Sequence, residues 1–321
     1  MPPWSERERR PRESIVTVDP LDALLGAVAQ FDIVDLSTDV VDHADGPFAT
    51  RLEVIEATPG AQILADQVVP RLVPELAGRL RPEHLPGSAF LRHETLTASV
   101  HAGSHIDAPG HYGGTLSAGA FINDAQPSHF IGPGILFDAS DVDGPEVRWE
   151  HLGSISRDQR NRDPEDLVGK IVLIRIAQRA SISALLVEAL LDRGVNVIGT
   201  NGASFDGPFE RSLEVFQRTN DPSALWPCHV LGRSRRYYQI EGLANLDRLP
   251  PRGFFVWAPP VMVRGATAAW TRALALVPRA RAAANGELAT AYRTRTNHIE
   301  GTEDACRAPL NHSRCTPGAD I

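Results

Sequence analysis

The sequence has few cysteines, a single lysine and no long apolar run, and these shortages exclude several classes of protein. Three cysteines in 321 residues are too few for a disulfide framework, and they lack the paired spacing of a zinc finger. Forty acidic side chains against 32 basic ones give a formal net charge of −8, so we expect no nucleic-acid partner. Since the N-terminal region resembles neither a signal peptide nor a spanning helix, we expect a cytoplasmic protein without a membrane segment.

The composition is that of a folded protein with an ordinary core. Hydrophobic residues make up 42% of the chain and charged residues 22%, which is typical of globular domains. Residues 1–20 are charged and contain prolines, and residues 279–321 show no sustained periodicity. We therefore predict a charged leader over residues 1–20, one catalytic domain over 21–278 and a peripheral extension over 279–321.

Strand and helix patterns alternate in mixed order along the predicted domain, without an internal repeat. Apolar periodicity predicts strands at residues 32–36, 91–100, 134–138, 170–177, 195–200, 254–257 and 268–277, and helices at 63–80, with breaks at Pro70 and Pro74, and 182–193. This order favours a single α+β domain with a mixed β-sheet flanked by helices.

The densest group of ligand-type side chains lies just after the second predicted strand. His101, His105, Asp107 and His111 fall within eleven residues. Glycines and a proline in this segment prevent a continuous helix, so we expect the side chains to converge through a turn. Neutral imidazole nitrogen and carboxylate oxygen suit zinc or manganese, and His101, His105 and Asp107 would leave coordination positions open. The alternative is that each histidine only bonds a loop carbonyl, but such a grouping has few structural reasons.

This segment resembles the signature His-x-Gly-Thr-His-x-Asp-x-Pro-x-His of the cyclase family of metal-dependent hydrolases, with Ser104 in place of threonine. That family includes bacterial kynurenine formamidase, isatin hydrolase and ring cyclases of aromatic polyketide pathways. Three further segments are similar to family sequences: DIVDLS at 32–37, VIGTNGASFD at 197–206 and WPCHVLGRSRRYYQIEGLANLDRL at 226–249. The resemblance covers about residues 31–277, and it implies a barrel-like sheet core of the swivelling β/β/α type.

The resemblance also implies a set of site residues. His111 matches the catalytic histidine of the family, and Asn201 departs from the aspartate usual in the central turn. One or two divalent ions, zinc or manganese, are expected, with Asp107 bridging between them where there are two. The implied ligands of the first ion are His101, His105 and Asp107, and those of the second are Asp107, His229 and Glu241. The candidate substrate contacts are Ser204, Phe205, Asp206 and Trp226.

These residue types predict hydrolytic chemistry on a small molecule. A divalent ion lowers the pKa of bound water towards ~7 and polarises a carbonyl, while His111 can act as general base and then general acid. We expect attack on a cyclic or aryl-linked amide or ester. Ring closure in aromatic polyketide (antibiotic) biosynthesis and a catalytically silent binding or assembly protein are the alternatives. The resemblance further implies a homodimer or homotetramer.

Overall fold

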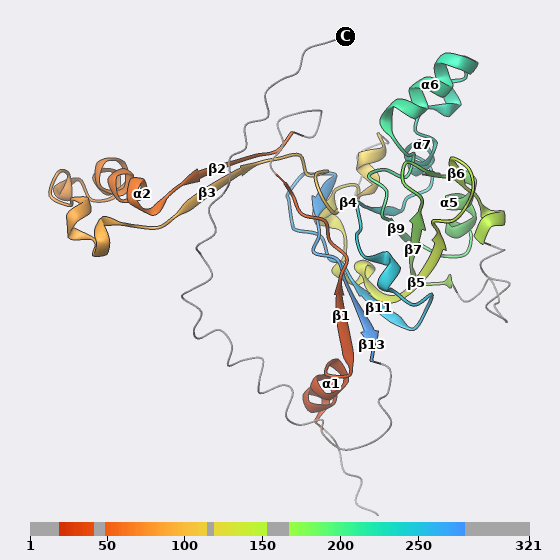
Figure 1. The fold of residues 1–321 in the computed structure, drawn as a ribbon, viewed down its shortest axis with the longest axis horizontal. Coiled ribbons are helices and arrows are strands. Elements are labelled where there is room, and N and C mark those ends of the chain that lie inside the picture. The colour runs from red at the N-terminus through yellow and green to blue at the C-terminus, as the bar shows by residue number, and fades with distance from the viewer. Residues whose placement is uncertain (1–18, 42–48, 114–118, 153–166, 280–321) are drawn as a thin grey trace, which may run out of the picture. The chain divides into compact units, whose positions relative to one another are not determined.

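The computed structural model describes residues 19–41, 49–113, 119–152 and 167–279 (Figure 1). The chain divides into two compact units, one of Phe31–Pro278 and one of Met1–Gln30 with Arg279–Ile321. The described part of the second unit contains helix α1 (Pro20–Val28). Asp19 is its N-cap residue, and the Asp19 carboxylate accepts a hydrogen bond from the backbone N–H of Leu21. The predicted leader and extension therefore lie almost entirely outside the described residues. Among the described helices, none combines the length and apolar character needed to span a bilayer.

A nine-stranded mixed sheet forms the centre of the larger unit. Its strands follow the order β1-β13-β11-β5-β7-β9-β10-β4-β12, with parallel pairing from β5 through β10 and antiparallel pairing elsewhere. The bounds are β1 Phe31–Asp35, β4 His105–Asp107, β5 Ile131–Ala139, β7 Ile171–Ile176, β9 Val197–Thr200, β10 Tyr238–Glu241, β11 Phe254–Trp257, β12 Ala268–Trp270 and β13 Leu274–Pro278. The predicted α+β fold with a mixed sheet is confirmed.

Helices and short 3-10 turns connect these strands. They include the helices α5 Ala184–Leu191, α6 Phe209–Thr219 and α7 Pro227–Gly232, and the 3-10 turns Pro109–Tyr112, Ile122–Asp124, Pro127–Phe130, Pro222–Ala224 and Leu246–Arg248. A separate parallel pair consists of β6 (Glu146–Val147) and β8 (Ser181–Ile182). The predicted helix over 182–193 corresponds to α5, and Gly194 follows it with a positive φ of 77°, a conformation that favours glycine.

Residues 51–97 form a ribbon and a helical segment that differ from the prediction. The strand predicted over 91–100 is shorter and pairs outside the main sheet, as an antiparallel ribbon of β2 (Arg51–Ile55) with β3 (His93–Thr97). Between the two strands lie α2 Ala57–Ile63, a π-helical turn Leu64–Val68, α3 Val69–Leu72 and 3-10 turns at Pro74–Leu76, Pro82–His84 and Pro86–Ser88. Pro70 does not break the helix, because it occupies the first turn of α3, where no N–H is needed.

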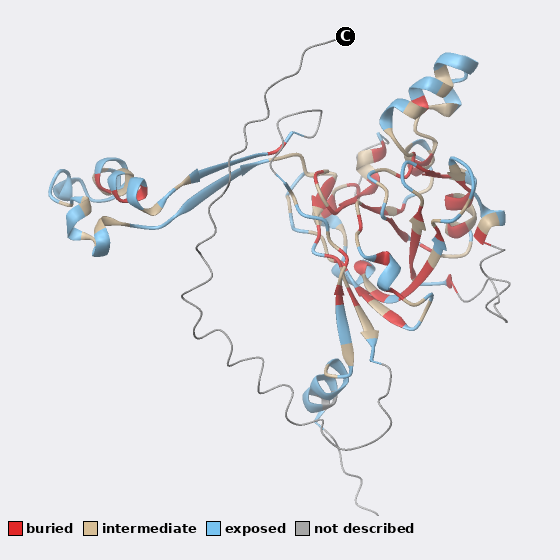
Figure 2. Ribbon diagram, in the orientation of Figure 1, coloured by how far each residue is buried: buried red, intermediate tan, exposed pale blue. Residues whose placement is uncertain are grey.

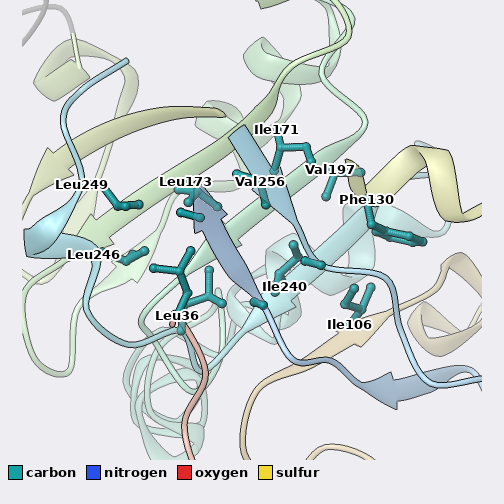
Figure 3. Close-up of a cluster of buried hydrophobic side chains, with 14 of the residues drawn as sticks. Leu36, Ile106, Phe130, Ile171, Leu173, Val197, Ile240, Leu246, Leu249 and Val256 are labelled. Carbon is teal, nitrogen blue, oxygen red and sulfur yellow. The ribbon is translucent and has the colours of Figure 1, made fainter. Parts of the chain in front are cut away.

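Two hydrophobic clusters cover the two faces of the sheet. Alternate residues of β7 divide between them: Ile171 and Leu173 belong to the cluster drawn in Figure 3, and Val172 and Ile174 belong to the other. Figure 2 shows the resulting burial along the central strands. Parallel strands buried on both faces are typical of sheets covered on both sides, and they hold the neighbouring strands β9 and β10 in fixed positions.

Two predictions about strands are corrected by the pairing. The strand predicted over 268–277 is two strands, because residues 271–273 interrupt it and β12 and β13 pair in different parts of the sheet. Strands β4 and β10 were not predicted. They have three and four residues, and their charged and polar side chains give no apolar run.

We expect Gly134 to be required for the pairing of β5 with β11. It lies directly opposite Phe254, and an added Cβ would come within 2.0 Å of the buried Phe254 ring. Gly134→Ala should lower the free energy of unfolding by ~1–3 kcal/mol through overpacking, measured by urea denaturation. Gly132→Ala is the matched control, because its Cβ would meet nothing closer than 3.8 Å. Equal denaturation midpoints for the two variants would contradict this account.

Candidate metal centre

The pairing of β4 with β10 builds the base of the site. His105 and Asp107 are two residues apart on β4, so both side chains project from one face of the strand. The antiparallel register sets Glu241 of β10 opposite His105 and Gln239 opposite Asp107. The glycines and proline of this segment predicted that the whole cluster lies in a turn, but His105 and Asp107 lie on a strand, which fixes their spacing more rigidly than a turn would.

Three more imidazoles reach Asp107 from other elements. His101 lies in the turn before β4, and its Nδ1 is 3.1 Å from Asp107 Oδ1. His111 comes from the 3-10 turn after β4, and His229 comes from α7; their Nε2 atoms lie 3.8 and 3.9 Å from Asp107 Oδ2. His105 Nε2 is 3.7 Å from Asp107 Oδ1. The carboxylate of Asp107 is therefore surrounded by four histidines.

The ligand atoms form two groups that share Asp107. Within each group, the candidate ligand atoms lie within 4.8 Å of one another. The first group is His101, Asp107 and His111, and the second is His105, Asp107 and Glu241. The structure thus brings together every predicted metal ligand, but it divides them differently from the arrangement that the resemblance implies, and it adds His111 to the candidate ligands.

The hydrogen bonding around Asp107 fits a bound cation. Its side chain is fully buried, yet among the described residues neither carboxylate oxygen has a hydrogen-bond partner of good geometry. The same holds for Nε2 of the buried His105, which lies 3.4 Å from Glu241 Oε2. Burying a carboxylate without partners is costly. A divalent ion that accepts imidazole nitrogen and carboxylate oxygen would satisfy all three atoms at once.

The local charges set the protonation of the histidines in the absence of a metal. Burial acts to lower the pKa of His105, but the contact with Glu241 and the nearby negative charge raise it to about 9. His229 is affected in the same way, with its bond to Asp206 raising its pKa to about 9 against the effect of burial. Burial lowers the pKa of His111 to about 4, so this ring is neutral. A cation entering the site must therefore displace protons.

Hydrogen bonds on the side away from the cavity orient two of the candidate ligands, His229 and Glu241. Asp206 Oδ2 lies 2.5 Å from His229 Nδ1, and Asp206 Oδ1 accepts a hydrogen bond of 2.8 Å from the backbone N–H of Cys228. Glu241 Oε1 accepts a hydrogen bond of 3.0 Å from the backbone N–H of Phe205. A carboxylate behind a ligating histidine fixes the ring and its tautomer. The turn at residues 197–206 therefore supports the site from behind.

The histidines and Glu241 open into a cavity of about 1150 Å³. Ser204 and Trp226, two of the predicted substrate contacts, line this cavity. Phe205 and Asp206 do not: the Phe205 ring is fully buried in the core, and Asp206 is bonded to His229. Residues 201–204 and 207–208 of this segment line the cavity, whereas Phe205 and Asp206 between them point into the protein, so substrate contact by these two residues stays a prediction from the sequence alone.

Several cavity residues were missed by the sequence analysis. Phe209, at the start of α6, faces the ring of Trp226 at 4.9 Å between centroids. Arg179 and Arg233 also line the cavity, and Arg233 Nε donates a 2.7 Å hydrogen bond to a backbone carbonyl. In the sequence, Phe209 follows the segment at 197–206 closely, and this proximity is a signal that could have identified it.

Cys228 lies in α7 and is a structural residue. It is fully buried, and its thiol donates to the carbonyl of Ile182 at 3.1 Å. Burial raises the pKa of this thiol well above its ordinary value. A buried neutral thiol of this kind is not an activated nucleophile.

Comparison with known proteins identifies the family of this chain. The Cyclase family model matches residues 34–207. The chain belongs to the Cyclase family. It is 31% identical over 193 residues to the kynurenine formamidase of Paracidovorax citrulli, covering 57% of this chain and 79% of that protein. It is 25% identical over 220 residues to the isatin hydrolase of Roseibium aggregatum, covering 60% and 77%.

A solved structure shows that the fold is shared as well. Isatin hydrolase A of Ralstonia solanacearum superimposes with a TM-score of 0.59 at 21% identity, over 82% of this chain and 99% of that one. The family model and the two curated relatives confirm the prediction of a Cyclase-family enzyme. For this Cyclase-family chain, the match over residues 34–207 includes β4 and the segment from His101 to His111, so the base of the site lies inside the shared region.

Replacing Asp206 tests the support behind His229. Asp206→Asn removes the charge that holds the imidazole, so the affinity of the protein for zinc or manganese should fall by about 10- to 100-fold. Metal titration of the metal-free protein measures this change. Asp221→Asn is the control, because Asp221 is an exposed residue that caps a turn through the N–H of Ser223. Unchanged affinity in Asp206→Asn would rule out the support we assign to it.

Proposed function

We propose that this chain is a metal-dependent hydrolase that cleaves the C–N or C–O bond of a cyclic or aryl-linked amide or ester. The observation that carries this proposal is the buried Asp107 carboxylate, which has four imidazoles around it and no hydrogen-bond partner of good geometry among the described residues. The names of the relatives, kynurenine formamidase and isatin hydrolase, support amide substrates.

The donor set favours zinc or manganese, with one or two ions per chain. The residues that would hold them are His101, His105, Asp107, His229 and Glu241. When bound, a divalent cation supplies Lewis acidity, which lowers the pKa of water and polarises a carbonyl oxygen. The protein contributes the cavity beside these ligands, where a carbonyl compound can be held against them.

His111 is the proposed general base and acid. Its side chain is 29% exposed and faces the cavity, and its ring is neutral, so Nε2 can accept a proton. In amide cleavage His111 takes a proton from the attacking water. It then gives that proton to the departing nitrogen, so the amine leaves neutral and the acyl group becomes a carboxylic acid.

Two substitutions separate this role from metal binding. His111→Ala should keep its metal and lose about 10²- to 10⁴-fold in kcat, because only proton transfer is removed. His105→Ala should lose both metal and activity, because a buried ligand is removed. Elemental analysis together with arylformamide hydrolysis measures both effects. Since the structure also sets His111 among candidate ligand atoms, a metal-free His111→Ala protein would show that this residue is a ligand and not the base.

Ring closure in an aromatic polyketide pathway would use the same residues and stays a prediction, because no structural observation favours it over hydrolysis. A catalytically silent protein is disfavoured by the presence of every predicted ligand at the site.

We also propose that the protein is a homodimer or homotetramer. Ribbon β2–β3 has two strands only, and none of its residues is buried. A two-stranded ribbon is at best marginally stable alone in water, and this one exposes the apolar side chains of Val54 and Leu96. Contact with a second copy of the chain would cover them.

A charge on the apolar side of the ribbon should therefore weaken assembly. Leu96→Glu is expected to shift the protein to a smaller species in sedimentation velocity at micromolar concentration. Thr97→Glu, the next residue on the other face and opposite Arg51, should sediment as the wild type. A monomeric wild-type protein, or identical sedimentation of both variants, would refute the proposed interface.

A further inference from the structure

The cavity beside the metal ligands is larger than a one-ring or two-ring substrate needs. Its volume of about 1150 Å³ exceeds the ~300–1,000 Å³ of pockets that enclose drug-sized ligands. The ligand residues account for only part of the lining. Apolar residues well outside the ligand set form much of the rest, among them Ile176, Leu225 and Val230.

The aromatic pair Phe209–Trp226 gives this cavity a stacking surface. The two rings lie 4.9 Å apart between centroids with an interplanar angle of 46°. Phe209 is 57% exposed, so its ring is accessible to a molecule bound in the cavity. The rings come from different elements, α6 and the residue before α7, and meet at the cavity wall.

The backbone holds Trp226 in an unfavourable conformation. Its φ is +50° and its ψ is 56°, in the left-handed region, where a bulky side chain is an outlier. Such conformations persist where the surrounding structure enforces them, and they concentrate at functional sites. Arg179, another cavity residue, also has a positive φ of 65°. The position of the indole ring is therefore maintained at a cost in backbone energy.

From these observations we infer that the enzyme selects amides or esters whose aryl group is polycyclic, with Phe209 and Trp226 as the specificity-determining residues that stack on its distal rings. This inference rests on the proposed hydrolase function and extends it to the size of the substrate. Aromatic rings prefer offset or tilted stacking, and each buried ring contributes both apolar area and ring–ring attraction.

A series of formamides with one cleaved bond and increasing ring number tests the inference. Formanilide, N-(2-naphthyl)formamide and N-(2-anthryl)formamide carry one, two and three rings, and each releases formate and an arylamine. We expect kcat/KM of the full-length, zinc- or manganese-loaded protein to rise with ring number. The highest value for formanilide, or equal values for all three, would overturn the inference.

Substitutions of Phe209 and Trp226 test whether these two residues determine the preference for polycyclic substrates. Trp226→Gly removes the ring and suits the left-handed backbone, so loss of folding is avoided. Trp226→Gly and Phe209→Ala should each lower kcat/KM for the three-ring formamide by about 10- to 100-fold and for formanilide by less than about threefold. Trp226→Phe should retain most of the activity on the three-ring formamide. Equal losses on all three formamides would contradict the specificity role.

Two controls separate the pair from general effects of truncation. The controls are Leu213→Ala and Trp257→Ala. Leu213 lies one helical turn after Phe209 in α6, and Trp257 is an exposed residue of β11. Neither Leu213 nor Trp257 lines the cavity. Both should match the wild type on every substrate. Selective loss on the three-ring formamide in either control would remove the evidence for the aromatic pair.

Binding of the product amines distinguishes failure of this inference from failure of the proposed function. If the metal-loaded protein cleaves none of the formamides, hydrolysis of this substrate class is refuted. The Kd values of aniline and 2-aminoanthracene then decide the size inference alone. Tighter binding of the three-ring amine that is weakened by Trp226→Gly would uphold it, and equal binding of the two amines would refute it.

Discussion

The structure of the site depends on one buried carboxylate. Asp107 lies on a strand in the interior of the sheet, and its negative charge can be kept there only with compensating positive charge or hydrogen bonds. Imidazoles from four positions supply part of that compensation, and the bonding left unsatisfied is what a divalent ion provides. If the proposed ion binds here, folding and metal binding are coupled, because the packing that buries Asp107 also gathers the candidate ligands.

The pairing of β4 with its neighbouring strands is what buries Asp107. Strand β4 lies between β10 and β12, and the β4–β10 register aligns His105 with Glu241. The opposite face of β4 presents Ile106 to the core cluster drawn in Figure 3, together with Ile240 of β10. Apolar side chains on one face therefore fix the two strands, while the other face carries the ligands. A shift in register by one residue would turn the apolar side chains away from the core and the ligand side chains away from the site, so both the packing and the ligand arrangement would be lost.

What the sequence could predict follows from how local each feature is. The segment from His101 to His111 was found from spacing alone, because its ligands are close in the chain. His229 and Glu241 have no such local signal, and only the family resemblance identified them. The apolar strand β7 was predicted closely, since burial on both faces gives a continuous apolar pattern. The contact of Asp206 with His229 of α7 was not predicted, because no local sequence pattern encodes a contact between residues so far apart in the chain.

The start of α7 connects Trp226 of the proposed stacking surface with His229 of the candidate metal centre. Trp226 precedes the helix, and its carbonyl accepts a hydrogen bond from Val230 N–H, so the strained residue is tied into the first turn. Cys228 anchors this turn in the core, and His229 extends from it to the metal site. One short helix therefore sets the separation between the stacking surface and the ligands. Because the buried Cys228 ties this helix to the core, the separation between the indole and the imidazole is set by α7, and under the proposed specificity a substrate would span that separation.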